Sequence, residues 1–411
     1  MSTAAPSASA STIAASKALE AVLRADKGRL ISALAYRLRD ISLAEEMLQE
    51  ASISALAHWG RAGLPASPQG WLLRVALRRA IDRIRAQGRA SRGAADMAML
   101  AEEEASEMTT EAIPDARLRM MFTCCHPALE LKSRVALTLR VICGLTTAQI
   151  AAVFLDNETT MGQRITRAKT KIAQAGIGFA IPAREDWPAR LQAVLTSVYL
   201  IFTRGYAAGP KGADLCGEAL FLARLLAQLC PDDPEIEGAL ALVLLTDARA
   251  AARAAGAMIT NQDRALWDSA KLDEGLALID TALARGRVGP FQIKAAVAAC
   301  HMADGGPDWP QIGALLTALL QFEDTPVVRL SIAVALGEVQ GPQAALTMLA
   351  GLTVDLDDYG PYHAARADMA ARLGQNDAAR MAYQRAIDLA ETPQDACFLT
   401  KALQNLPAIR A

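Results

Sequence analysis

Residues 145–173 constrain the fold more than any other stretch, because two capped helices fit within them. Thr146 and Gln149 have the spacing of a capping box, in which each side chain accepts a hydrogen bond from the other residue's backbone N–H. This pattern predicts a short helix directly after Thr146. The same spacing recurs at Thr160 and Gln163 after a polar break, and it predicts a second helix that runs to the end of the stretch.

The second of these helices is amphipathic. Its apolar residues recur at the period of a buried helical stripe: Met161, Ile165, Ala168 and Ile172. The opposite face is polar and basic, with Gln163, Arg164, Arg167 and Lys171. Because Arg and Gln can read base edges in a major groove, one interpretation is a DNA-binding helix-turn-helix. The other is an ordinary helical hairpin with a solvated basic face.

Composition favours an all-α protein. The chain of 411 residues is 52% hydrophobic and 5% aromatic, and its leading apolar residues, Ala and Leu, are good helix formers. The N-terminal residues lack the features of a signal peptide, and no apolar run is long enough to span a membrane. Seven scattered cysteines form no disulfide framework. We therefore expect a cytoplasmic protein without a membrane segment.

Charge divides the chain into a basic front and an acidic rear. Residues 1–180 carry 23 Lys and Arg against 17 Asp and Glu, whereas the remainder carries 19 against 27. Such a division indicates that residues 1–180 bind a polyanion and that the remainder does not.

An acidic helix face is expected near the front of the chain. After a first helix over about 17–39, apolar residues again recur at helical spacing: Ile41, Ala44, Leu48, Ala51 and Ala55. Polar and carboxylate residues lie off this stripe: Asp40, Glu45, Glu46, Gln49 and Glu50. The face is either solvated or a docking surface for a basic partner.

An arginine-rich helix follows the loop over 60–69. Residues 71–92 contain seven Arg and one acid, and the helix carries Arg74, Arg78, Arg79, Arg83 and Arg85. Phosphate neutralisation is the natural use of such a concentration of positive charge. Leu73, Ala76, Leu77, Ala80 and Ile84 are expected to point inward. Trp71, at the head of the helix, either stacks on an unpaired base or belongs to the core.

Residues 93–113 carry six acidic residues and no Lys or Arg, which predicts an acidic linker between two basic modules. Beyond it, short helices are expected near 118–122 and over 131–143, ahead of the helix-turn-helix.

These pieces together resemble an RNA polymerase sigma factor of the sigma-70 family, of the extracytoplasmic-function kind. The resemblance covers about 18–174 and rests on three segments in order. They are D-I-S-L-A-E-E-M-L-Q-E (40–50), P-x-x-P-x-x-W-L-x-R-V-A-x-x-x-A-I-D-R-I-R (65–85), and G-L-T-T-A-Q-I-A-A-V-F with T-x-x-x-R-I-T-R-A-K (144–169).

The resemblance implies a role for each basic or acidic face. Docking on RNA polymerase core, at the β′ clamp, would use Asp40, Glu45, Glu46, Gln49 and Glu50. Recognition and melting of the −10 promoter element would use Trp71, Arg74, Arg78, Arg79, Arg83 and Arg85. The −35 element would be read by Thr160, Gln163, Arg164, Arg167 and Lys171. The second module would also contact the β flap, and the acidic linker would thread the polymerase channel.

The implied layout is a disordered tail over 1–15, sigma region 2 over 16–92, the linker over 93–113, region 4 over 114–178 and a helical extension over 179–411. Family members usually end after region 4, but a subgroup carries an extension that resembles tetratricopeptide repeats. Two residue pairs lie 34 apart here, the tetratricopeptide period: Ala345 with Ala379, and Leu349 with Tyr383. The groove of such an extension could hold a protein or peptide partner, or act on the front half.

Other functions fit less well. The cysteines and histidines lack zinc-ligand spacing, so we expect no metal, and no nucleophile or nucleotide motif indicates an enzyme or a cofactor. The alternatives left open are a stand-alone helix-turn-helix regulator, which needs no docking face or acidic linker, and a tetratricopeptide scaffold with an incidental basic front.

Overall fold

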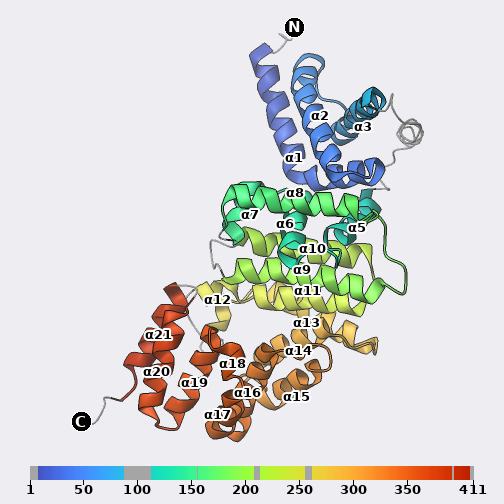
Figure 1. Ribbon diagram of the computed structural model, residues 1–411. Helices are drawn as coiled ribbons and strands as arrows, with labels where there is room; N and C mark the ends of the chain where they lie inside the picture. The colour runs from blue at the N-terminus through green and yellow to red at the C-terminus, as the bar shows by residue number, and fades with distance from the viewer. Residues whose placement is uncertain are drawn as a thin grey trace. The chain divides into compact units, whose positions relative to one another are not determined.

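The computed structural model describes residues 8–87, 113–154, 156–207, 213–254, 262–390 and 393–407. Every regular element within these residues is a helix, which confirms the all-α prediction (Figure 1). The chain divides into two compact units, Met1–Leu200 and Ile201–Ala411, each described by itself below. Most of the expected acidic linker lies outside the described residues.

The first half of unit 1 consists of α1 (Ala8–Leu38), α2 (Ile41–Ala62) and α3 (Pro68–Gln87), which pack on one another (Figure 1). Since α1 begins at Ala8, the tail expected over 1–15 is too long. Arg39 adopts a left-handed φ of 52°, which ends α1, and the Asp40 side chain then caps α2. The predicted apolar stripe of α2 is buried. On α3 the predicted inward residues are buried except Ile84, which is only half-buried. Ile81, which was not predicted, is buried in its place.

The second half of unit 1 consists of α5 (Ile113–Cys124), α6 (Leu131–Val141), α7 (Thr147–Phe154) and α8 (Glu158–Gln174). The boundary between the two units falls within α9 (Trp187–Ala207). The predicted inward residues of α6 and its C-cap, Val135, Leu139 and Ile142, are buried. Helix α5 packs along α1, so the two halves of unit 1 share a core.

Unit 2 is a series of helices joined by short turns. Its first members are α10 (Ala213–Leu229), α11 (Pro234–Asp247), α12 (Ala250–Ala254), the 3₁₀ helix η5 (Arg264–Leu266) and α13 (Ser269–Ala284). The later members are α14 (Pro290–His301), α15 (Trp309–Leu319), α16 (Pro326–Gln340), α17 (Pro342–Ala350), α18 (Thr353–Leu356), α19 (Gly360–Arg372), α20 (Asn376–Asp388) and α21 (Pro393–Gln404). Seven of these helices carry Pro at the first or second position, where its missing N–H leaves no hydrogen bond unmade.

The later helices of unit 2 repeat at a fixed interval. Helices α16 and α19 begin 34 residues apart, and so do α17 and α20. The residue pairs predicted from this period, Ala345 with Ala379 and Leu349 with Tyr383, are all buried. Each helical pair therefore places the same positions in its core.

Candidate nucleic-acid interface

The helix-turn-helix of α7 and α8 is held by two different caps. At the first, Thr146 N–H donates to Gln149 Oε1 at 2.8 Å and Gln149 N–H donates to Thr146 Oγ1 at 3.2 Å, which confirms the capping box. At the second, the Asn157 side chain accepts from Thr160 N–H at 2.7 Å. The prediction of a second box at Thr160 was wrong, because Asn157 satisfies that N–H and the helix begins earlier.

The amphipathic pattern of α8 is confirmed. Met161, Ile165, Ala168 and Ile172 are buried. The opposite side exposes four of the five residues predicted to contact the −35 element: Thr160, Gln163, Arg167 and Lys171. Their amide, guanidinium and ammonium groups are available to base edges and phosphates.

Arg164, the fifth residue of that set, is engaged inside the motif. Its Nη1 lies 2.6 Å from Asp156 Oδ2, and both side chains are partly buried. Asp156 belongs to the turn between α7 and α8, where its backbone N–H also donates to Ala151 O at 3.0 Å. Arg164 thus ties the turn to α8.

Two of the basic residues of α3 also contact α2. Arg74, Arg78, Arg79 and Arg85 are exposed. Arg79 also donates to Glu50 and to Ser54 Oγ, both at 2.7 Å, and the half-buried Arg83 donates to Glu46. Arg79 and Arg83 therefore join α3 to α2, and the carboxylates that they pair with belong to the predicted docking face.

Trp71 is half-buried and packs between two aromatic neighbours. Its ring lies 5.4 Å from His58 in a stacked arrangement and 5.6 Å from Trp59 edge-on. Trp59 itself is fully buried. Trp71 is consequently part of an aromatic cluster at the junction of α2 and α3, with some of its surface left accessible.

The predicted docking face of α2 is only partly open. Asp40 is the N-cap, accepting from Ser42 N–H at 2.7 Å and Leu43 N–H at 3.0 Å. Glu46 and Gln49 are exposed. Glu45 is turned toward the second half of unit 1, where it pairs with Arg140 of α6 at 3.2 Å and with Lys169 of α8.

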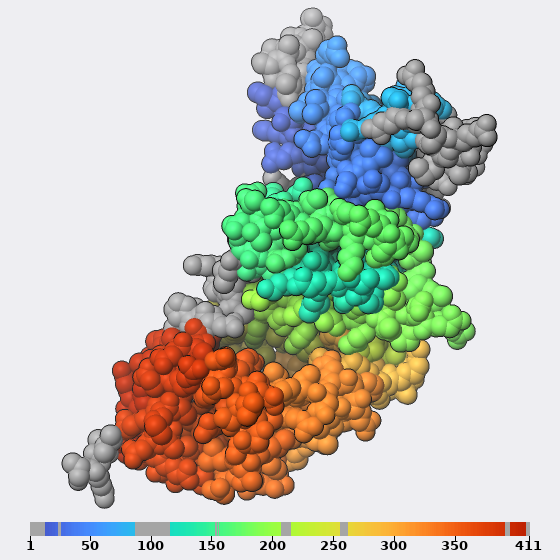
Figure 2. Space-filling view, in the orientation of Figure 1, coloured from blue at the N-terminus to red at the C-terminus, as the bar shows by residue number. Residues whose placement is uncertain are grey.

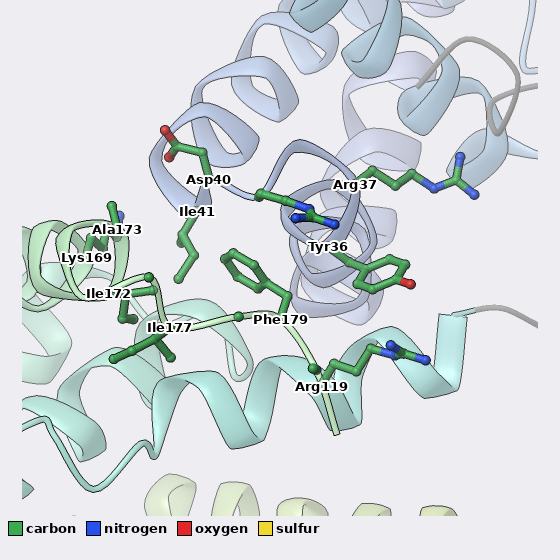
Figure 3. A pocket seen from close by; sticks show the side chains of 14 residues that line it. Tyr36, Arg37, Asp40, Ile41, Arg119, Lys169, Ile172, Ala173, Ile177 and Phe179 are labelled. Atoms are coloured by element: carbon green, nitrogen blue, oxygen red, sulfur yellow. The ribbon is translucent and has the colours of Figure 1, made fainter. Parts of the chain in front are cut away.

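The contact between the halves of unit 1 could not be deduced from the sequence. Figure 2 shows the surface of the first three helices, in blue, lying directly against that of α7 and α8, in green. Beside this contact is a cavity of about 710 Å³, lined by the α1–α2 corner, Arg119, α8 and the segment after α8. Figure 3 shows Ile41 and Phe179 facing each other across it. No local pattern marks Arg140 or Lys169 as partners of Glu45, because 95 and 124 residues separate them.

Within the described residues, no group of three or more His, Cys, Asp or Glu side chains is placed to hold a metal ion. Cys124 and Cys125 are fully buried, and burial raises the pKa of both thiols, so they behave as core residues. None of the described helices combines the length and the apolar character that a membrane crossing requires.

Comparison with known families assigns the two halves of unit 1. Residues 22–90 match sigma-70 region 2, residues 119–172 match sigma-70 region 4, and residues 190–283 match a family of unknown function (DUF6596). An uncharacterized protein of Rhizobium meliloti (strain 1021) is 41% identical over 406 residues, which cover 95% of this chain and 96% of that protein. No solved structure matches the chain.

The matches to sigma-70 regions 2 and 4, on two basic helical modules, assign the chain to a family of DNA-binding transcription factors. The chain belongs to the sigma-70 family, whose regions 2 and 4 it carries in the expected order. Its partners are accordingly RNA polymerase core and promoter DNA.

Proposed function

We propose that the chain is an extracytoplasmic-function sigma factor with a tetratricopeptide-like C-terminal extension, which binds RNA polymerase core in the cytoplasm and directs it to particular promoters. The observation that carries the DNA-reading part is the exposed face of α8, where Gln163, Arg167 and Lys171 stand opposite a fully buried apolar stripe. A face of this composition on the second helix of a helix-turn-helix suits major-groove contact.

The proposed division of labour follows the surfaces. Helix α8 reads the −35 element, and the region 4 module contacts the β flap. The exposed Arg74, Arg78 and Arg85 of α3 bind phosphates at the −10 element, and the accessible part of Trp71 stacks on an unpaired base there. Gln49 of α2 contacts the β′ clamp first. Arg79, Arg83, Glu45, Glu46 and Glu50 contact polymerase or DNA only after their internal ion pairs are broken.

A reconstitution experiment tests the proposal. The full chain is mixed with core polymerase, and transcription is measured from a start site that core alone ignores. We expect the R167A variant to retain core binding but lose promoter-specific transcription. R184A is the matched control, because Arg184 is also an exposed cation but lies outside the helix-turn-helix. Failure of the wild-type chain to bind core, together with retained DNA binding, would instead indicate a stand-alone helix-turn-helix regulator.

For the extension we propose a regulatory or supportive role. The support is that α16 with α17 and α19 with α20 are helical pairs with the 34-residue interval of tetratricopeptide repeats, whose stacks form binding grooves. A chain that stops after Ala207 keeps α9 whole and tests this role. Unchanged transcription and unchanged regulation by this shortened chain, with its helix content intact, would contradict it.

A further inference from the structure

The 3₁₀ helix η5 joins the ends of two longer helices in unit 2. Asp268, just after η5, donates its backbone N–H to Ala248 O, at the end of α11, over 2.9 Å. Arg264, within η5, donates from Nη2 to Met302 O, at the end of α14, over 3.0 Å. The ends of α11 and α14 are therefore fixed on either side of η5.

Three basic side chains gather at this junction, and we call them the Arg249 cluster: Arg249, Arg253 and His301. Arg249 directly follows the cap of α11, and His301 is the last residue of α14. Arg253 of α12 lies 3.8 Å from the ring centroid of Tyr206 and donates to Tyr206 O at 2.6 Å. Burial lowers the pKa of the Arg249 guanidinium, and the charge of Arg253 lowers it further. Burial and then the charge of Arg249 lower the pKa of His301, so Arg249 lies near both other members.

The Arg249 cluster contains polar atoms that the rest of the chain leaves unused. Within the described residues, the Arg249 side chain makes no hydrogen bond and its Nε is buried. His301 Nδ1 is also buried without a partner. The partial negative charge of helix C-termini accounts for Arg253 and Arg264, because both donate to carbonyl oxygens there. It does not account for Arg249, which donates to none, and an unsatisfied buried donor is costly, more so when it is charged.

The positive charge of the Arg249 cluster indicates which kind of ligand fits. Neither Arg249 nor Arg253 forms an ion pair with any residue that the structure describes. One phosphate group carries a charge of about −1.5 to −2 at pH 7, so it neutralises both guanidinium groups, whereas a carboxylate neutralises only one. The planar fork of arginine also matches phosphate oxygens in pairs.

The surrounding charge favours a small ligand over a nucleic acid. After residue 180 the chain carries 19 Lys and Arg against 27 Asp and Glu. An acidic surface of this kind repels an extended polyanion, but a single phosphate group interacts mainly with the basic residues nearest to it.

We propose that Arg249, Arg253 and His301 form a binding site for the phosphate group of a small molecule. Arg249 and Arg253 are half-buried, so the ligand approaches from solvent, and small rotations of the side chains direct Arg249 Nε and His301 Nδ1 toward its oxygens. The guanidinium groups donate to the phosphate, and the imidazole donates when protonated at Nδ1. The inference goes beyond the proposed sigma function and does not depend on it, because the binding belongs to unit 2.

Histidine NMR of the full chain tests the site. The chain has four His, and the signal that disappears in H301N is that of His301. Inorganic phosphate and ribose 5-phosphate are titrated separately at constant pH, with sodium chloride of equal ionic strength as the control. We expect both phosphates, but not chloride, to shift the His301 signal saturably. A short DNA duplex should leave this signal unchanged, even where it binds the basic modules of unit 1.

Two outcomes of these titrations would overturn the proposal. The first is a His301 signal that neither phosphate shifts. The second is a signal that DNA shifts and the small phosphates do not, which would assign the Arg249 cluster to nucleic acid instead.

Substitution of the arginines tests whether they hold the phosphate. R249Q and R253Q keep a polar side chain but remove the charge, and we expect each to weaken phosphate binding at least about tenfold in the same titration. R366Q is the matched control, because Arg366 is also half-buried and lies 5.5 Å from the ring centroid of Tyr362, outside the cluster. Unchanged affinity in folded R249Q and R253Q, or an equal loss in R366Q, would overturn the proposal. If a variant fails to fold, the wild-type titration still decides.

Discussion

Arg164 of α8 forms a 2.6 Å ion pair with Asp156, the residue of the turn that lies just before the cap of the same helix. The pair gives two basic residues on one helix different roles. Arg164 stabilises the geometry of the helix-turn-helix, whereas Arg167, one turn further along, is exposed.

The R167A variant should therefore weaken promoter binding, and R164A should chiefly weaken the fold. We expect R167A to lose about 1–3 kcal/mol of binding to the −35 element if it contacts a base. We expect R164A to lose about 0.5–1 kcal/mol of folding stability, because partly exposed ion pairs contribute little. Holoenzyme binding to promoter variants and thermal unfolding measure the two effects. Equal loss on all sequences would make Arg167 a phosphate contact.

Glu46 offers a test of the docking face. It is exposed and pairs with Arg83, so the E46K variant both removes a carboxylate and repels the neighbouring guanidinium. We expect affinity for core polymerase to fall on the order of tenfold, or about 1.4 kcal/mol. E185K, at an exposed acid outside the docking face, is the matched charge reversal. Identical core affinities for the two variants would contradict the docking role.

Two glycines in unit 2 should respond in opposite directions to alanine. A Cβ on Gly238 of α11 would lie 2.7 Å from the backbone N of Gln292 in α14, so G238A should destabilise by about 1–3 kcal/mol. A Cβ on Gly313 of α15 would find only Ala335 Cβ at 3.8 Å, so G313A should stabilise by about 0.5–1 kcal/mol through helix propensity. Chemical denaturation measures the free energy of unfolding of both variants. A stabilising G238A substitution would show that α11 and α14 are packed less closely than the structure indicates.

Thiol reactivity should separate the cysteines of unit 2. Burial, with a nearby carboxylate, raises the pKa of Cys216 and Cys230 to about 11, whereas Cys397 is exposed. The raised pKa lowers the thiolate fraction of Cys216 and Cys230 at pH 8, and the greater basicity of their thiolates recovers only part of the lost rate. Iodoacetamide at pH 8 should therefore alkylate Cys397 at least about tenfold faster. Mass spectrometry of the folded chain measures the alkylation rates. Similar rates for Cys397, Cys216 and Cys230 would contradict the burial of the last two.

Much of the fold follows from local pattern. The stripe on α8 and the box at Thr146 depend on residues three or four positions apart, which sequence displays directly. The cap at Asn157 was missed because Thr160, an equally good capping residue, lies three positions later. The partners of Arg79 and Glu45 could not be predicted from the sequence. Periodicity shows which face a side chain occupies, but not which distant carboxylate or cation will meet it.

The constant interval between the later helices of unit 2 has a consequence for how such extensions change length. Because α16 and α19, and likewise α17 and α20, begin 34 residues apart, an insertion or deletion of 34 residues adds or removes one whole helical pair. An insertion or deletion of half that length would put the first helix of a pair at the position of the second helix. Changes in the length of this region should therefore occur in whole repeats.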